Sequence, residues 1–119
     1  MIEWKEKKFQ ELTTKELYEI SRVRSEVFVV EQEILYNDFD RKDYKAIHLS
    51  GFIEEELVAY ARIFDKGDYY KNYPGFGRVA VIEKERGNLT SSLIWLERSS
   101  ALGSSTAQMK MRQALIHEL

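Results

Sequence analysis

The sequence predicts an α+β fold, with a mixed and largely antiparallel sheet flanked by helices. Three patterns lead to this prediction. An amphipathic helix with a clear start signal follows an early strand, two alternating runs are joined by a short polar connection, and a β-branched run precedes a second helical pattern. The predicted order is therefore strand, helix, loop or short helix, three strands and helix.

The first helix has the strongest local signals in the chain. Thr13 and Glu16 have the spacing of a capping box, and Leu12 and Leu17 occupy the two positions of a hydrophobic staple. Apolar side chains then recur every three or four residues, at Leu17, Ile20, Val23, Val27 and Val30. These signals predict one helix from about residue 14 to about residue 31.

Four segments have the pattern of strands. Residues 2–9 alternate weakly and fit an edge strand, while residues 46–53 and 57–64 alternate clearly and predict an antiparallel hairpin through Glu54–Glu56. Residues 78–82 form a short, β-branched run that fits a central strand covered on both faces. The segment 32–44 mixes acidic, turn-forming and aromatic residues, which indicates a structured loop or a short second helix.

Length and composition restrict the class of protein. The chain of 119 residues is long enough for one domain and too short for two, and its net charge of −2 argues against a nucleic-acid partner. It has no cysteine, which excludes disulfides, thiolate nucleophiles and cysteine-ligated zinc, and we expect no metal cofactor. No segment resembles a secretion signal or a membrane span, so the expected location is the cytoplasm, away from membranes.

The composition changes sharply after residue 88. Residues 1–88 contain 33 of the 38 charged side chains and 14 of the 15 aromatic ones, whereas residues 89–119 contain 6 of the 9 serines. The second part is therefore either a helical segment with its own character or the altered end of a longer domain.

A candidate anion site follows the β-branched run. Arg86 supplies positive charge, Gly87 permits close approach of the backbone, and a helical pattern then begins. Free N–H groups and the helix dipole favour anions at such a position, and hydroxyl donors follow at Thr90, Ser91 and Ser92. The alternative is an ordinary capped helix after a turn.

Several strings then occur in one characteristic order. They are Phe28-Val29-Val30-Glu31-Gln32, Tyr36 with Asp38 and Asp40, His48 with Gly51, Glu56 to Ile63, Gly77 to Val81, and Arg86-Gly87. In this order the sequence resembles the ElaA-type branch of the GNAT superfamily of N-acetyltransferases. The resemblance covers residues 1–88, so residues 1–119 are expected to form a single GNAT-like domain with a divergent part at 89–119.

The resemblance implies transfer of an acetyl group from acetyl-CoA to a primary amine of a small molecule or a protein. The resemblance implies that the central strand, here residues 78–82, splays from its neighbour, and that its free N–H groups bind the pantetheine arm and polarise the thioester carbonyl. Here those groups belong to Val79, Ala80 and Val81. The pyrophosphate would lie on Arg86, Gly87, Asn88, Ser91 and Ser92.

The acceptor side has weaker candidates. The segment that shapes this side in the family contains Glu31, Tyr36, Asp38 and Asp40, which suggests a cationic amine; the alternative is a solvated acidic loop. Arg62 and Arg78 are expected to be structural partners of these acids.

Two residues are candidates for catalysis. His48 matches a family position and alternation turns it away from Ile47 and Leu49, toward a cleft; the alternative is a hydrogen-bonded histidine of the sheet. Glu83 follows the last strand and could act as a general base through water; the alternative is a surface turn residue.

The sequence also departs from the family. Leu89 and Ser91 replace positions that are usually small or basic in the pyrophosphate loop, no tyrosine follows Tyr73, and the closing hairpin is expected to be absent. Truncation, a frameshift or degeneration would each explain this. The second hypothesis is therefore a remnant without catalysis that binds CoA weakly or serves as an interaction module. An uncovered sheet edge would then favour a homodimer or aggregation.

Overall fold

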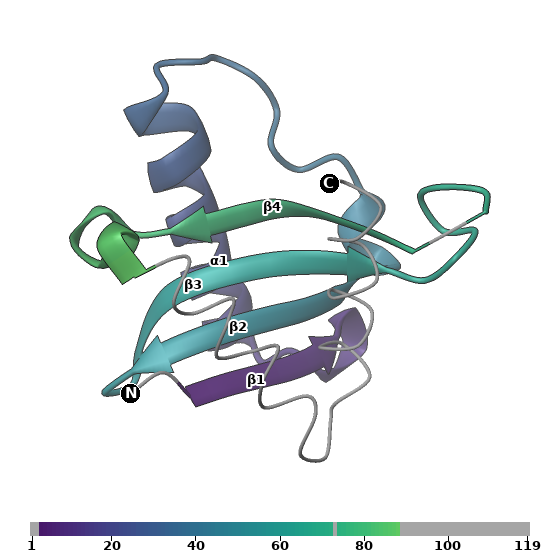
Figure 1. Ribbon diagram of the computed structural model, residues 1–119, viewed down its shortest axis with the longest axis horizontal. Helices are drawn as coiled ribbons and strands as arrows, with labels where there is room; N and C mark the ends of the chain where they lie inside the picture. Colours follow the sequence, from purple (N-terminus) through teal and green to yellow (C-terminus); the bar gives the residue numbers. More distant parts are fainter. Residues whose placement is uncertain (1–2, 73, 89–119) are drawn as a thin grey trace.

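A four-stranded antiparallel sheet with one helix across a face makes up the described part of the chain (Figure 1). The computed structural model describes residues 3–72 and 74–88. The strands are β1 (Glu3–Lys8), β2 (Ile47–Ile53), β3 (Glu56–Phe64) and β4 (Gly75–Val81). The helical elements are α1 (Thr14–Arg24), the continuous η2 (Ser25–Glu31), and the short turns η1 (Phe9–Glu11), η3 (Lys42–Tyr44) and η4 (Glu83–Asn88).

The long helix begins as the sequence predicts. The Thr13 N–H donates to Glu16 Oε1 at 2.8 Å, and the Glu16 N–H donates to Thr13 Oγ1 at 3.0 Å, which confirms the capping box. Helical structure ends at Glu31 as expected, but from Ser25 onward the winding is the wider π form. Three β-branched valines lie in that stretch, and such side chains crowd the turn of a regular α-helix.

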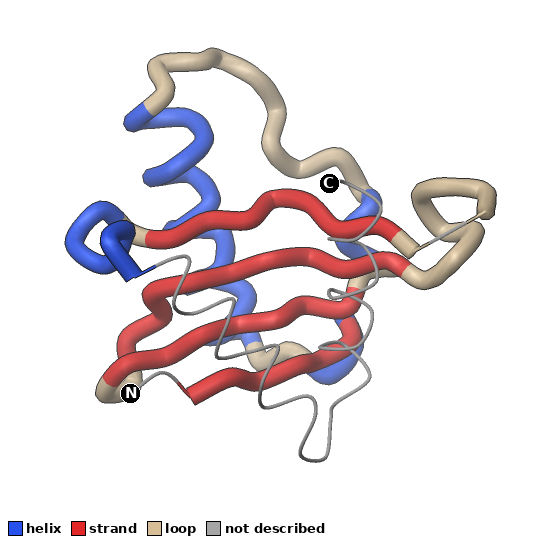
Figure 2. Tube along the Cα trace, viewed as in Figure 1, coloured by secondary structure: helices blue, strands red, loops and turns tan. Residues whose placement is uncertain are grey.

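The strands follow one another across the sheet in the order β1-β2-β3-β4 (Figure 2). The first three occur where the sequence predicts them. β4 begins at Gly75, earlier than predicted, and it lies at the edge of the described sheet rather than at its centre. The neighbour from which β4 was expected to splay lies outside the described residues.

Apolar side chains cover both faces of the sheet. On the helical face, a cluster that includes Ile20 and Val23 of α1 packs against Val58 and Tyr60 of β3. On the other face, Leu49, Ala61 and Ile63 form a second cluster with Trp4, Ile47 and Val79. Within the described ranges, no helix combines the length and the apolar character needed to cross a bilayer.

The predicted connection between β2 and β3 is a two-residue turn. Ile53 pairs with Glu56, so Glu54 and Glu55 alone form the loop, with φ angles of 49° and 70°. Positive φ at both positions is the type I′ geometry, which matches the twist of a hairpin. Side chains other than glycine and asparagine strain this geometry by about 1–2 kcal/mol per residue.

Replacing Glu55 by glycine should therefore stabilise the hairpin. We expect Glu55→Gly to raise the free energy of unfolding by about 0.5–1 kcal/mol, because glycine adopts positive φ without strain but loses more entropy on folding. Urea unfolding followed by circular dichroism measures the change. Glu55→Ala is the control, since it removes the same charge and keeps the strain. An equal gain in both variants would show that charge, not backbone conformation, limits the turn.

Candidate functional site

Three arginines from three elements meet three aspartates on the segment between η2 and β2. The contacts are Arg24–Asp38 at 2.7 Å, Arg24–Asp43 at 2.7 Å, Arg62–Asp43 at 3.2 Å, Arg62–Asp40 at 2.7 Å, Arg78–Asp40 at 3.6 Å and Arg78–Asp38 at 2.7 Å. Each arginine contacts two aspartates and each aspartate contacts two arginines. These six side chains therefore form a closed cycle, here called the ion-pair ring.

The ring is largely removed from water. The side chains of Arg24 and Arg62 are each 2% exposed and that of Asp38 is 5% exposed. Arg62 holds Asp40 with a fork of two hydrogen bonds, at 2.8 and 2.7 Å, and these bonds keep the pKa of Asp40 well below its ordinary value. Burial acts to lower the pKa of Arg62, but the bonds and charge of Asp40 outweigh it and raise that pKa.

The ring positions the whole segment that follows the helix. In Figure 1 this segment runs from the end of η2 along the β4 edge of the sheet to η3. It forms a structured loop with a single 3₁₀ turn, one of the two alternatives that the sequence allows. The expected pairing of Arg62 and Arg78 with acids of this loop is confirmed. Because three positive charges balance three negative ones, Asp38 and Asp40 add little net negative charge toward a cationic acceptor.

His48 joins the ring to the sheet. Its Nε2 lies 3.0 Å from the carbonyl oxygen of Asp43 and its Nδ1 lies 2.7 Å from the hydroxyl of Tyr60. A carbonyl only accepts, so Nε2 carries the proton, and Nδ1 accepts from the Tyr60 hydroxyl when the ring is neutral. Burial lowers the pKa of His48, which favours the neutral form. Both nitrogens of this 1% exposed side chain are thus engaged.

His48 also lines a cavity of about 340 Å³ between the helix, η1 and the loop. Its other lining residues are Phe9, Leu17, Ser21, Arg24, Phe39, Arg41, Asp43 and Tyr44. The rings of Phe9 and Tyr44 meet edge to face at 4.9 Å and form one wall. The side chain therefore faces a cavity, as strand alternation indicates, and that cavity adjoins the ion-pair ring.

β4 contains a bulge beside this site. Tyr60 pairs with Ala80 but Arg62 pairs with Gly77, so Arg78 and Val79 together oppose the single residue Ala61. Arg78 has a φ of 50°, a left-handed conformation that is rare for a residue with a side chain. The bulge interrupts the ladder with β3 at Val79.

Beyond the bulge, the backbone groups of β4 alternate. The Ile82 N–H donates to the Val58 carbonyl at 3.0 Å. By alternation the Ala80 N–H faces β3 and the Val81 N–H faces the opposite edge. The thioester contact predicted for Val79, Ala80 and Val81 stays a prediction.

The remaining predicted site residues are not members of the ion-pair ring. The Tyr36 hydroxyl donates to Asp38 Oδ1 at 3.2 Å, while Glu31 is the last residue of η2. Glu83 is exposed at the start of η4, where it lines a surface hollow with Arg22, Glu26, Glu56, Ile82 and Lys84. The backbone of η4 includes Arg86, Gly87 and Asn88, and Ser91 and Ser92 lie outside the described residues.

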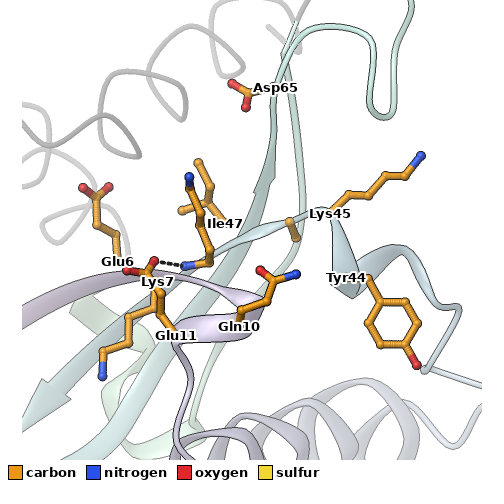
Figure 3. A pocket seen from close by; sticks show the side chains of 10 residues that line it. Glu6, Lys7, Gln10, Glu11, Tyr44, Lys45, Ile47 and Asp65 are labelled. Atoms are coloured by element: carbon orange, nitrogen blue, oxygen red, sulfur yellow. Dashed lines mark hydrogen bonds between the residues drawn. The ribbon is translucent and has the colours of Figure 1, made fainter.

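Another hollow, of about 450 Å³, lies near the end of β1 (Figure 3). Its lining residues carry both signs of charge and include Glu6, Lys7, Glu11, Lys45 and Asp65. None of the predicted site residues lines it, although Tyr44 lines both this hollow and the cavity beside His48.

Sequence reasoning missed three residues that organise the site, namely Arg24, Asp43 and Tyr60. Arg24 lies four residues after Ile20 and three before Val27, on the apolar face of the predicted helix. A charged residue on a buried face needs a partner, and three aspartates follow in the next loop. That spacing was the available signal for a buried ion pair.

The ring should make stability sensitive to acid. The pKa of Asp40 is lower in the folded chain than in the unfolded one, so its contribution is complete above the ordinary aspartate pKa of about 3.9 and is lost as the pH falls below it. We expect Asp40→Asn to lower the free energy of unfolding by about 3 kcal/mol at neutral pH, because Arg62 loses its main partner. The difference in free energy of unfolding between Asp40→Asn and the unchanged chain, here called the gap, should be smaller at about pH 3.

Urea unfolding at both pH values measures this gap. Asp68→Asn is the matched control, because Asp68 is an exposed aspartate and should show little difference at either pH. A gap for Asp40→Asn that stays constant with pH would contradict a contribution from its charge.

Comparison with known proteins places this geometry in a family. No protein-family model matches the chain. The chain is 42% identical to the protein ElaA of Escherichia coli over 89 residues, which are 73% of this chain and 58% of that protein. It is 39% identical to a UPF0039 protein of Synechocystis sp. over 87 residues, 72% of this chain and 56% of the relative. The chain thus spans less than two thirds of the length of these curated relatives.

Two solved structures have the same fold. An acyl-CoA N-acyltransferase from Pseudomonas aeruginosa superposes with a TM-score of 0.74 at 33% identity, over 85% of this chain and 70% of that one. Escherichia coli ElaA superposes with a TM-score of 0.72 at 38% identity, over 85% of this chain and 71% of that one. The chain therefore belongs to the ElaA-type branch of the GNAT superfamily and has the α+β fold of the acyl-CoA N-acyltransferases.

Proposed function

We propose that the chain is an N-acetyltransferase that moves an acetyl group from acetyl-CoA to a primary amine of a small molecule or a protein. One observation carries the proposal: the bulge at Arg78 interrupts the ladder between β3 and β4 in a fold of the acyl-CoA N-acyltransferases. An extended ligand can add to the edge of a sheet as a further strand, and a bulge changes which main-chain groups face that edge.

The cofactor side of the proposed site consists mainly of backbone. Val79, at the bulge, with Ala80 and Val81 after it, is proposed to contact the extended amide arm and the carbonyl beside it through the main chain. Such donors stabilise negative charge that develops on a carbonyl oxygen. These residues therefore fit a pantetheine arm without any charged side chain at the reacting carbon.

When bound, acetyl-CoA supplies the activated thioester. The proposed pyrophosphate site begins in η4, shortly after β4, with Arg86, Gly87 and Asn88. Ser91 and Ser92 are proposed as further donors. A guanidinium and main-chain N–H groups are suitable partners for phosphate oxygens. Leu89 and Ser91 replace smaller or basic residues of the family pattern, so we expect weaker binding than a glycine-rich loop would give.

The acceptor side is proposed to lie along the loop that the ion-pair ring holds, with the exposed Glu31 and Tyr36 as polar groups of this side. Asp38 and Asp40 would shape this side through their arginine partners rather than by their own charge. An amine must lose a proton before it attacks, and the exposed Glu83 could accept that proton through water. Because both nitrogens of His48 are engaged, its proposed part is to hold Asp43 and Tyr60 in place.

Calorimetric titration of the folded chain with acetyl-CoA and with CoA tests the proposal. We expect saturable binding in the micromolar range, weakened about tenfold or more by Arg86→Ala, because a charged hydrogen bond to phosphate is lost. Lys84→Ala is the matched control: it removes the same charge two positions earlier, from a side chain that pairs with Glu56 at 2.6 Å. Its affinity should stay close to that of the unchanged chain.

Two outcomes would contradict the proposal. A folded chain that gives no heat with millimolar CoA would favour the alternative of a remnant without catalysis. Equal losses in Arg86→Ala and Lys84→Ala would show a general electrostatic attraction rather than a pyrophosphate site. If binding is confirmed, a screen of primary amines with acetyl-CoA, read by thiol release, identifies the acceptor.

A further inference from the structure

Arg78 combines an unusual backbone conformation with unusual restraint of its side chain. Its φ of 50° places it in the left-handed region, where glycine is the common residue of a strand bulge. Gly75 and Gly77 lie in the same strand, three and one positions before Arg78, yet the bulge falls on the arginine. Local sequence preference therefore does not account for the position of the bulge.

The contacts of the Arg78 side chain account for the position of the bulge, which backbone preference does not explain. Its Nε donates to Asp38 at 2.7 Å, its Nη2 lies 3.6 Å from Asp40, and its guanidinium lies over the ring of Tyr36 at 5.7 Å. Both acids are fixed in turn, Asp38 by Arg24 and Asp40 by Arg62. Arg78 thus reaches from the sheet to a loop whose charges are already held from two other elements.

We propose that Arg78 is a positioning residue, whose ion pairs to Asp38 and Asp40 hold the bulge of β4 open and thereby join the acceptor-side loop to the acyl-CoA strand. The link to acyl-CoA rests on the function proposed above, whereas the link between loop and bulge is a property of the fold alone. A change in the loop then alters the register of β4, and the two sides of the site are not independent.

The register of β4 gives a readout that needs no ligand. Only a bulged strand places Ala80 opposite Tyr60 and Gly77 opposite Arg62 at the same time. A regular strand in the first register would place residue 78 opposite Arg62. Cross-strand NOEs measured by NMR on the isotopically labelled chain distinguish the two states.

Two substitutions of the same residue separate the side chain from the backbone. Arg78→Ala removes the ion pairs and leaves a residue that disfavours positive φ, so the NOE between Arg62 and Gly77 should be lost. Arg78→Gly removes the same ion pairs but adopts positive φ freely, so both NOEs should remain. Arg78→Gln, which keeps part of the apolar stem without the charge, should behave as the alanine variant and serves if that variant does not fold.

The affinity for acyl-CoA, measured by calorimetry, should fall in the variants that lose the bulged register of β4. We expect acetyl-CoA to bind about tenfold more weakly to Arg78→Ala and within about threefold of the unchanged affinity to Arg78→Gly. Glu55→Ala and Glu55→Gly are the controls, because Glu55 also has positive φ, at 70°, but lies in the turn between β2 and β3, outside the loop. These two variants should differ in stability and leave the NOEs of β4 and the affinity unchanged.

The proposal is overturned if Arg78→Ala keeps both cross-strand NOEs, since the bulge would then form without its tether. It is also overturned if the Glu55 pair changes the register, whereas loss of the register in both Arg78 variants would support the tether. Should the unchanged chain bind no acyl-CoA, the function proposed above fails, and the NOEs still decide whether Arg78 holds the bulge.

Discussion

The closed ring of ion pairs is the constraint around which the described part of the chain is arranged. A buried guanidinium without a partner is strongly destabilising, so Arg24 and Arg62 require carboxylates at a defined place, and the partly buried Arg78 contacts the same carboxylates. All three find them on one short segment, which therefore cannot move without exposing several charges at once. The ring fixes the helix, the loop and two strands relative to one another, a task that apolar packing alone performs with less angular precision.

The same constraint determines the character of the candidate site. The loop appears acidic in the sequence, but its aspartates neutralise arginines of the scaffold, so it acts as a rigid wall more than as a source of negative charge. His48 extends the ring through the main chain of Asp43 and the hydroxyl of Tyr60. On the other side the ring reaches Arg78 and the bulge of β4. The polar interior thus links the loop to β2, β3 and β4.

Local signals in the sequence predicted most of the described fold. The helix start follows from Thr13 and Glu16, which contact each other, and the hairpin follows from alternation on both sides of Glu54–Glu56. The family resemblance is supported by the relatives and the solved structures. These predictions succeeded because each depends on residues that are neighbours in the chain or on strings of adjacent residues.

The parts that sequence reasoning missed depend on distant residues or on unusual backbone. Arg24 and Asp43 are 19 positions apart. The order of charged residues along the chain does not determine which aspartate pairs with which arginine. The bulge falls at an arginine and the hairpin turn on two glutamates, where glycine or asparagine would have been the visible signal. The roles of Glu83 and of the Arg86–Ser92 stretch remain proposals, since the fold alone does not assign them.

The wide spacing of the ring partners has a consequence for folding kinetics. Its contacts join residues from 14 to 40 positions apart and need the helix, the loop, β3 and β4 all in place. Contacts of this kind are made after the hairpin and the helix, which require only neighbouring residues. Interactions that are absent from the transition state slow unfolding without accelerating folding. The ring therefore forms late in folding. It lengthens the lifetime of the folded chain more than it shortens the time that the chain needs to fold.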